Sequence, residues 1–289
     1  MEPNTFTQRY LELGGKAPLF ELPESIRVNT AKITAEELIE RLWQKGVHLE
    51  KIPFVKNGFY VRQSRMSVSA LQEHLQGFYY IHEAASQIPA EVLNPGKTDL
   101  VLDCCAAPGG KTTQMALNAK AVVALESQHN RVPALINNIE RLGIKNIIVC
   151  NTDARMFEPE IKFDKILVDA PCSGNYITDT RWFRKQKLEN FKQRSALQKE
   201  ILANIVNCLS DEGELVYSTC SLEPEEDEMV IDWAIKSLGM KAVEISCLGD
   251  KGIISPFGEE LDKGVENCRR LWPFKAKTQG FFIAKLVRA

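Results

Sequence analysis

From residue 99 onward the chain alternates short apolar runs with amphipathic stretches, and this alternation limits the possible folds more than any other feature of the sequence. The apolar runs lie at residues 99–106, 121–126, 146–150, 163–170 and 213–220, and the amphipathic stretches at about 110–119, 130–142, 191–209 and 224–238. Nearly continuous apolar strands separated by helices are typical of a parallel sheet covered by helices on both faces. We therefore predict a doubly wound α/β fold, which binds ligands beyond the carboxyl ends of its strands.

The first part of the chain follows a different pattern. Residues 26–62 predict a strand, a helix that stops at Gly46, and two further strands, which together form a small α+β module. We divide the chain into an arm at residues 1–25, a small RNA-binding module at 26–75 and a large domain at 76–289. The segment "PLFELP" in the arm is expected to be irregular. Residues 279–286 predict one more strand, at an antiparallel edge of the large sheet.

Composition places the chain among soluble proteins of the cytoplasm. Of its 289 residues, 44% are hydrophobic and 26% charged, and no uncharged apolar run approaches the length of a membrane span. The eight cysteines show no regular spacing, and the four histidines follow no zinc pattern, so we expect reduced thiols and no bound metal. We expect a cytoplasmic monomer without membrane contacts. The net charge of −2 counts mildly against a nucleic-acid partner, so any RNA binding must depend on local basic patches.

The segment "DCCAAPGGKTTQMAL", residues 103–117, predicts a ligand loop between the first strand of the large domain and its helix. Gly109 and Gly110 let a ligand approach the backbone, although a tight turn with a solvated Lys111 explains the same residues. Glu126 closes the second strand, where an acid typically binds ribose hydroxyls, and Asp153 follows the third, placed for an adenine amine. Neither a dinucleotide fingerprint nor a complete phosphate loop is present, so S-adenosylmethionine is the expected ligand.

Two cysteines end neighbouring strands, in "VDAPCSG" (168–174) and "STCSLEPEEDE" (218–228). Either Cys172 or Cys220 alone would be interpreted as packing, since free cysteine is among the most buried residue types. Two thiols at the ligand end of the sheet favour chemistry instead. The acids that follow Cys220 are expected at the start of a helix with Pro224 in its first turn. Five other cysteines are expected to pack in the interior, namely Cys104, Cys150, Cys208, Cys247 and Cys268.

The segments "CAAPGGK", "VALE", "NTDAR", "VDAPCSG" and "STCSLEPEEDE" occur in the same order in RNA 5-methylcytosine methyltransferases. Across about residues 26–285 the chain resembles this family of bacterial 16S rRNA cytosine methyltransferases and eukaryotic Nop2/Sun proteins. The short archaeal tRNA methyltransferases are the most similar kind. The resemblance implies a Rossmann-like class I methyltransferase fold with a mostly parallel seven-stranded sheet, plus an RRM-like N-terminal module.

The resemblance also implies roles for individual residues. Cys220 would be the nucleophile that adds to carbon 6 of cytosine, and Cys172 would help to release the product. Asp169 would hold the base, with help from Lys111. The residues implied to bind S-adenosylmethionine are Cys105, Ala106, Ala107, Pro108, Gly109, Gly110, Lys111, Glu126, Asp153 and Asp169. Two departures are Glu126, where many members have aspartate, and "YYIHEAASQIP" (79–89), where relatives often read Gln-Asp before Ala-Ser; no role is transferred to His82 or Glu83.

The stretch at residues 181–200 carries seven basic and two acidic residues, with Trp182, Phe183 and Phe191 between them. Such a stretch predicts RNA binding by phosphate contacts from Arg181, Arg184 and Lys185 and by stacking on aromatic rings. A solvated amphipathic helix with its aromatic residues in the core is the alternative. The expected partner is structured RNA, with tRNA ahead of rRNA. A non-catalytic RNA-binding or assembly factor remains open, whereas a DNA cytosine methyltransferase lacks support because its Glu-Asn-Val motif is absent.

Overall fold

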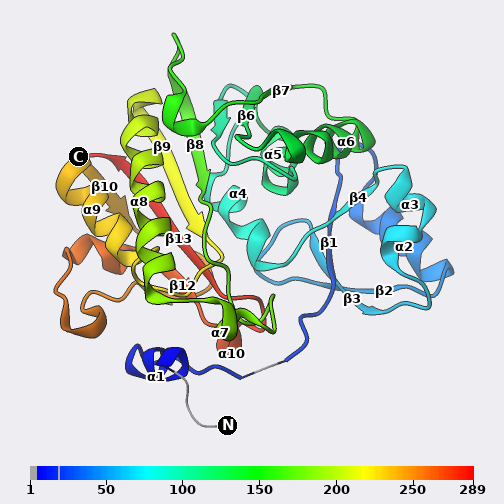
Figure 1. Cartoon of the computed structure of the whole chain (residues 1–289). Helices are drawn as coiled ribbons and strands as arrows, with labels where there is room; N and C mark the ends of the chain where they lie inside the picture. The colour runs from blue at the N-terminus through cyan, green and yellow to red at the C-terminus, as the bar shows by residue number, and fades with distance from the viewer. Residues whose placement is uncertain (1–4, 19) are drawn as a thin grey trace.

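The computed structural model describes residues 5–18 and 20–289, which form one large and one small sheet (Figure 1). In the large sheet the strand order is β11-β12-β13-β9-β8-β5-β6-β7, and β10 also pairs with β13. The strands are β5 (Leu100–Asp103), β6 (Ala121–Leu125), β7 (Ile147–Cys150), β8 (Phe163–Asp169), β9 (Leu209–Thr219), β10 (Met240–Val243), β11 (Asp250–Lys251), β12 (Arg269–Leu271) and β13 (Phe281–Arg288). The five strands β9, β8, β5, β6 and β7 are parallel to one another, as predicted.

Two details of the large sheet differ from the sequence-based expectation. The described residues contribute nine strands to the sheet rather than the seven that the resemblance implies, and the sequence pattern did not predict β10, β11 and β12, which have only two to four residues each. The strand expected at an edge, β13, instead lies inside the sheet, antiparallel to β9 and next to β12 and β10. An apolar run predicts a buried strand, but its position in the sheet depends on pairings distant in sequence.

Helices cover both faces of the large sheet, as Figure 1 shows. On one face, α8 and α9 pack on the side chains of Leu102, Ile166 and Val168, and on the other, α4 and α5 pack on those of Val101 and Leu167. The α-helices of the chain are α1 (Thr5–Glu12), α2 (Ala35–Gln44), α3 (Gln72–Leu75), α4 (Ile88–Leu93), α5 (Gly110–Ala116), α6 (Val132–Leu142), α7 (Trp182–Lys185), α8 (Leu188–Ile205), α9 (Glu228–Leu238) and α10 (Pro273–Ala276). Short 3₁₀ turns lie at Val68–Ala70, Ala85–Gln87, His129–Arg131, Ala154–Met156, Val206–Cys208, Pro256–Gly258 and Lys263–Asn267.

The small sheet contains four antiparallel strands in the order β2-β3-β1-β4. Its strands are β1 (Ser25–Val28), β2 (His48–Lys51), β3 (Gly58–Gln63) and β4 (Tyr79–Ile81), and with α2 and α3 they give the βαββαβ succession of ferredoxin-like modules. The helix α2 begins at a complete capping box of Thr34 and Glu37. The boundary expected at residue 75 is wrong for this sheet, because β4 completes it; three residues are too few to be recognised as a strand from the sequence.

Both faces of the small sheet are covered. Leu38 and Leu42 of α2 pack with Ile26 on one face. On the opposite face Tyr60 joins the core formed by α4 and α5. Arg27 of β1 is buried on this second face and donates hydrogen bonds to the carbonyl of Gly110 and, at 2.8 Å, to the hydroxyl of Thr113. The small module is therefore packed directly against the loop that begins α5.

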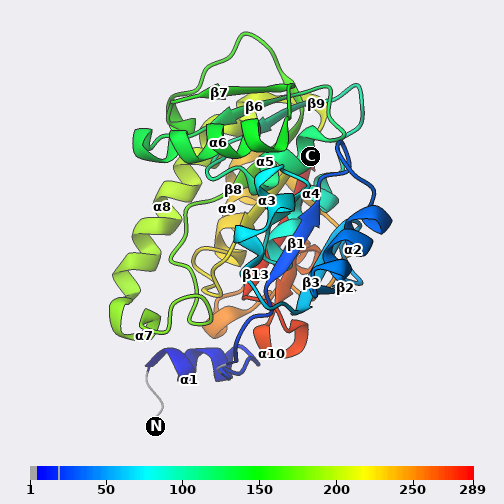
Figure 2. The same cartoon turned by 90° about the vertical axis from the view of Figure 1, so that its right-hand side faces the viewer.

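The arm carries a helix that the sequence analysis did not predict. In α1, the side chains of Phe6 and Tyr10 are buried against Trp182 and its neighbours, and α1 lies beneath α7 and α10 in two perpendicular views (Figure 1, Figure 2). The segment at residues 18–23 is irregular, as expected, apart from residue 19, which lies outside the described residues. In the described part of the chain, no helix combines the length and the apolar character needed to cross a membrane.

Candidate active site

Cys172 and Cys220 lie next to each other at the carboxyl end of the large sheet. Cys172 follows β8 and Cys220 follows β9, and these neighbouring parallel strands place Asp169 opposite Ser218. Because both strands end at the same level, the Sγ atoms of Cys172 and Cys220 are 3.1 Å apart. Both cysteines are free, so the contact is a thiol hydrogen bond.

The buried carboxylate of Glu226 joins the turns that carry these cysteines. One oxygen, Oε2, accepts hydrogen bonds from the backbone N–H of Ser173 at 2.9 Å and from the amide of Gln198 at 3.1 Å. The other, Oε1, accepts one from the hydroxyl of Ser221 at 3.3 Å. Ser173 and Ser221 each directly follow a cysteine, so one side chain sets the spacing of the two turns. Burial raises the pKa of Glu226 to about 7, although its donors act to lower it.

The acids that follow Cys220 were expected to decorate the start of a helix, and that prediction is wrong. Residues 224–227 form a turn, and α9 begins only at Glu228. Asp227 and Glu228 are fully buried and pair with the equally buried Arg270, while Glu223 pairs with Arg9 of α1 at 2.9 Å. These carboxylates face interior cations rather than solvent, so the chain cannot continue as a regular helix from Pro224. Cys220 consequently does not lie at a helix N-terminus.

A lysine and a carboxylate lie beside the two thiols. The Nζ atom of Lys111 donates a hydrogen bond to Oδ2 of Asp169 at 2.7 Å, and the hydroxyl of Ser218 donates to Oδ1 at 2.8 Å. Burial acts to lower the pKa of Lys111, but the charge and hydrogen bond of Asp169, together with the nearby Cys220, outweigh it and raise the pKa. The hydrogen bond with Cys220, followed by burial, raises the pKa of Cys172 well above its ordinary value. At neutral pH, an ammonium group and a protonated Cys172 thus lie next to Cys220.

The predicted ligand loop lines a cavity of about 240 Å³. Gly109 adopts a φ of +103°, in the left-handed region that favours glycine, so its role is to form the turn before α5. A Cβ atom on Gly110 would come within 2.9 Å of Nε2 of His82, so this glycine makes room for a histidine ring of the same chain. The cavity is lined by Tyr80, Ile81, His82, Glu83, Ser86, Asp103, Cys105, Ala106, Ala107, Pro108, Gly110, Lys111 and Asp169.

The two acids expected to bind an adenosine line a second cavity of about 150 Å³. Cys105 lines both cavities, so they are adjacent. The carboxylate of Glu126 accepts hydrogen bonds from the backbone N–H groups of Ala107 at 3.3 Å and Gln128 at 2.8 Å, which fix its orientation. The carboxylate of Asp153 pairs with Arg155 at 2.8 Å, and that side-chain hydrogen bond lowers its pKa. The structure therefore brings the predicted loop, Glu126 and Asp153 together around two adjacent cavities.

The five cysteines predicted to pack do lie in apolar surroundings. Cys104, Cys208 and Cys268 are buried in the core between the large sheet and α8 and α9, and Cys150 packs against the same core. Cys247 packs against the core on the other face.

Two of the three aromatic residues in the basic stretch do not face solvent. Trp182 is 1% exposed and Phe191 is 0% exposed, and their rings stack on each other and contact Phe6 of α1. Stacking of RNA bases on these two rings is therefore excluded in this structure, and the alternative of a helix with aromatic residues in the core is correct for them. Arg181, Arg184 and Lys185 are exposed, although Lys185 pairs with Asp179.

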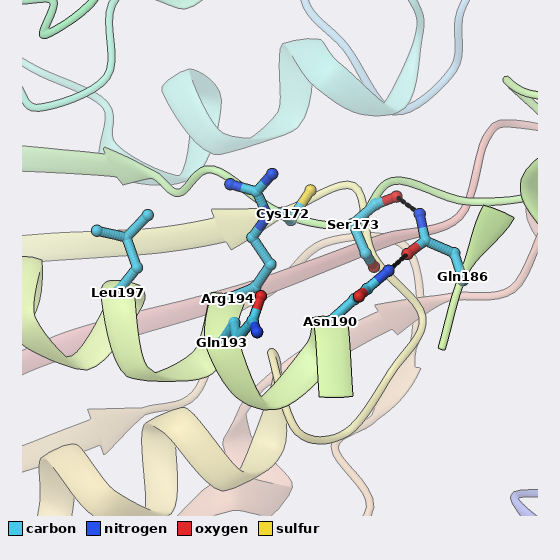
Figure 3. Close-up of a pocket in the computed structure, with 7 residues that line it drawn as sticks. All are labelled: Cys172, Ser173, Gln186, Asn190, Gln193, Arg194 and Leu197. Atoms are coloured by element: carbon cyan, nitrogen blue, oxygen red, sulfur yellow. Dashed lines mark hydrogen bonds between the residues drawn. The ribbon is translucent and has the colours of Figure 1, made fainter. Parts of the chain in front are cut away.

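A third cavity, of about 570 Å³, lies between the Cys172 turn and α8 (Figure 3). Its lining residues are Cys172, Ser173, Gln186, Asn190, Gln193, Arg194 and Leu197. Leu197 also lines the cavity with Glu126 and Asp153, so the three cavities surround the segment that links Asp169 to Cys172.

Comparison with known proteins explains why these features occur together. A family model described as "16S rRNA methyltransferase RsmB/F" matches residues 90–287, and the model of the N-terminal domain of 16S rRNA methyltransferase RsmF matches residues 3–84. The chain belongs to the RsmB/F family. It is one of the RNA cytosine-C5 methyltransferase families, and its S-adenosylmethionine-dependent members share the class I methyltransferase fold seen here.

Curated relatives of this RsmB/F chain are named for rRNA. The chain is 36% identical over 278 residues to the 25S rRNA (cytosine-C(5))-methyltransferase nop2 of Schizosaccharomyces pombe, covering 91% of this chain and 46% of the relative. It is 36% identical over 280 residues to the ribosomal RNA small subunit methyltransferase F of Vibrio parahaemolyticus, covering 92% of this chain and 57% of the relative. The chain thus spans about half the length of these relatives.

Two solved structures match almost the whole RsmB/F chain. A methyltransferase homologue from Pyrococcus horikoshii has a TM-score of 0.85 at 36% identity, covering 93% of this chain and 88% of the other. NSun6 from Pyrococcus horikoshii, solved with the S-adenosylmethionine analogue SFG, has a TM-score of 0.83 at 27% identity and covers 93% and 91% of the two chains.

Sequence reasoning missed two groups of residues around the site. Tyr80, His82, Glu83 and Ser86 line the first cavity, and the local signal near them was the polar pair His82-Glu83, because β4 itself is too short to be recognised from the sequence. The amides around the third cavity, on and before α8, carried no local signal at all. Their common position results only from the way α8 packs beside the Cys172 turn.

Proposed function

We propose that this chain is an S-adenosylmethionine-dependent RNA (cytosine-5-)-methyltransferase that acts through a transient bond between Cys220 and cytosine. The observation that carries the proposal is the pair of sulfur atoms 3.1 Å apart beside the Lys111–Asp169 pair and next to the cavity of the predicted ligand loop. A methyl transfer to an oxygen or nitrogen atom has no use for two thiols. Transfer to carbon 5 of cytosine does, because that carbon is a weak nucleophile until a group has added to the ring.

Each residue at the site can perform a different step of this reaction. The thiolate of Cys220 adds to carbon 6, and a proton on the ring nitrogen balances the electrons that this addition moves into the ring; the N–H so formed donates a hydrogen bond to the Asp169 carboxylate. Carbon 5 is then nucleophilic and takes the methyl group. Water then takes the proton from carbon 5, the electrons of that bond expel the Cys220 thiolate, and the ring nitrogen returns its proton to solvent, which restores the aromatic ring. Cys172, which stays protonated at neutral pH, can donate its hydrogen bond to the Cys220 sulfur during both addition and elimination.

The donor set around the first two cavities fits S-adenosylmethionine, which would supply the methyl group as an electrophilic sulfonium. The carboxylate of Glu126, held by two backbone N–H groups, suits a pair of ribose hydroxyls. The loop residues and Asp169 would contact the amino-acid end, and Asp153 the adenine. Asp153 reaches that role only if it shares its oxygens with Arg155.

We propose tRNA as the substrate, because the motifs of the chain resemble those of the short archaeal tRNA methyltransferases. The names of the curated relatives favour rRNA as the second candidate. RNA of either kind would be met in the cytoplasm. The small module would contact RNA through its edge and loops, where Arg62 and Arg65 are exposed, because both of its faces are covered. Arg181, Arg184 and Lys185 would contact phosphates.

Transfer of a tritiated methyl group to RNA lacking 5-methylcytosine tests the activity, and bisulfite sequencing of the product names the target base. We expect Cys220→Ala to abolish transfer, and Cys172→Ala to accumulate a protein–RNA complex that survives denaturing electrophoresis. Cys150→Ala, at the end of β7 in the same sheet, is the matched control and should behave as the wild type. Normal turnover by Cys220→Ala would refute the assignment, and no transfer by the wild type to any RNA would favour a non-catalytic binding factor.

A further inference from the structure

The third cavity is larger than the other two cavities of the candidate site, and its chemistry differs from theirs. Cys172 lines it on one side and the first half of α8 on the other, as Figure 3 shows. Its volume of about 570 Å³ lies within the range of small-ligand sites. No carboxylate lines it, whereas the other two cavities contain Asp103 and Asp169 or Glu126 and Asp153.

Arg194 gives this cavity an unneutralised positive charge. Its guanidinium reaches from α8 toward the side chain of Cys172 (Figure 3). Across the described residues, the Arg194 side chain has neither an ion pair nor a hydrogen bond, and the same holds for Gln193. By contrast, Lys111 and Arg155, which line the other two cavities, pair with carboxylates. A guanidinium without a carboxylate partner is suited to bidentate binding of a phosphate.

Two further amides face the cavity in fixed positions. Gln186 donates a hydrogen bond to the carbonyl of Ser173 at 3.2 Å and accepts one from Asn190 at 3.0 Å. These contacts hold both side chains against the Cys172 turn while leaving further amide donors and acceptors free. Amide groups held in this way can read the hydrogen-bonding edge of an unstacked base.

We propose that this cavity binds the nucleotide next to the target cytosine in single-stranded or flipped-out form. Its phosphate would contact Arg194, and its base would be read by Asn190 and Gln193. The inference rests on the proposed function, because it assumes that the target base lies at Cys220. Cys172 separates that base from the cavity, so the adjoining nucleotide of the same strand is the part of the substrate that reaches it. The cavity would then set which sequence around the cytosine is methylated.

The test uses a short RNA hairpin that carries the cytosine mapped by bisulfite sequencing. Arg194→Ala should raise the KM for this RNA roughly tenfold with little change in kcat, because one charge-assisted phosphate contact is lost. The slope of log RNA affinity against log salt concentration should also become shallower by about one, which corresponds to one phosphate contact. Replacing the phosphate beside the cytosine by a methylphosphonate should weaken binding to the wild type but not to Arg194→Ala. Lys192→Ala is the matched control, because Lys192 is exposed on the same helix but lines a different cavity.

Base reading has its own readout. Hairpins with each of the four bases, or an abasic site, beside the cytosine should differ in kcat/KM for the wild type and should become nearly equal for the Asn190→Ala/Gln193→Ala double variant.

Each other outcome overturns the inference. If Arg194→Ala and Lys192→Ala have the same KM for RNA, the cavity does not hold a phosphate of the substrate. If Arg194→Ala instead weakens binding of S-adenosylmethionine, measured by calorimetry without RNA, the cavity belongs to the donor site, with which it shares Leu197. If the wild type methylates no RNA, the proposed function fails and this inference fails with it.

Discussion

Glu226 was expected at the exposed start of a helix, but it is buried and accepts hydrogen bonds from the two turns that carry the cysteines. Glu226 is 0% exposed, and its two oxygens hold the Cys172 and Cys220 turns together. In the unfolded chain the pKa of this glutamate lies near 4.5, and in the folded chain burial raises it to about 7. The folded state therefore binds the proton more tightly. The contribution of protonated Glu226 to the stability of the folded state is fully present below about pH 4.5 and is lost as the pH rises through 7.

We predict that Glu226→Gln removes this pH dependence. The amide can still accept from Ser173 and Gln198 and can donate to the hydroxyl of Ser221, but it does not ionise. Between pH 4.5 and 8, the free energy of unfolding of Glu226→Gln should therefore rise relative to the wild type by on the order of 3 kcal/mol. Urea denaturation at several pH values measures this difference. The exposed Glu212→Gln should follow the wild-type profile, and a parallel profile for Glu226→Gln would contradict the prediction.

The same position gives a second prediction, on activity. Glu226→Ala leaves the Ser173 N–H and the Gln198 amide without their acceptor inside the protein, at a cost of about 1–3 kcal/mol for each buried group. The turns would separate, so kcat should fall while the affinity for S-adenosylmethionine stays close to the wild-type value. Rescue of kcat by Glu226→Gln would identify Glu226 as a positioning residue. Equal loss of kcat in both variants would argue instead that its charge is required.

At the scale of elements, α1 connects the N-terminal end of the chain to the candidate site. Phe6 and Tyr10 bury the helix against Trp182, and Arg9 reaches the turn after Cys220, where it pairs with Glu223 at 2.9 Å and Glu225 at 2.8 Å. Glu223 is buried, and burial raises its pKa while Arg9 acts to lower it. Arg9 of α1 thus neutralises the carboxylate of Glu223, which is buried in the turn after Cys220.

We predict that Arg9→Ala destabilises the protein by about 2 kcal/mol at pH 8, because the buried charge of Glu223 loses its main partner. The loss should be smaller at pH 5, where Glu223 can take up a proton. Adding Glu223→Gln should recover most of the stability, as thermal and urea denaturation can show. Lys16→Ala removes an equal charge from an exposed position of the arm and should change little. A pH-independent loss would mean that Arg9 acts by packing alone.

At the scale of the whole molecule, the small module supports the loop of the first cavity. Arg27 lies in β1 of the small sheet, yet it donates hydrogen bonds to Gly110 and Thr113 at the start of α5. Burial lowers the pKa of Arg27 to about 10, so it stays charged at neutral pH. His82, which follows β4, fills the space that a Cβ on Gly110 would need. The loop is therefore held between two sheets. Arg27 does not line the first cavity, but it helps to hold the loop that does.

We predict that Arg27→Met weakens binding of S-adenosylmethionine roughly tenfold, since the loop loses at least two hydrogen bonds from the small module. Titration calorimetry without RNA measures the affinity. Arg62→Met removes an exposed cation from the same sheet and should leave the affinity unchanged. Unchanged affinity in Arg27→Met would show that the loop is held by the large domain alone.

Local pattern determined much of this protein. The alternation after residue 99 was enough to predict β5 to β9 and the helices α5, α6 and α8 between them, because periodicity reports which face of a segment is buried. The order of the motifs was enough to place Cys172, Cys220, Asp169 and Lys111 at one end of the sheet, since parallel strands end at a common edge.

Only the tertiary structure determined which charged side chains and which aromatic rings are buried in the protein interior. The acids after Cys220, the rings of Trp182 and Phe191 and the helix α1 have the composition of surface segments, and they are buried because distant partners, such as Arg270 and Arg9, pack against them. The 3.1 Å contact of the sulfurs and the cavity beside α8 have the same origin. Burial of a polar group depends on compensation by groups far away in the chain, and a local pattern cannot contain that information.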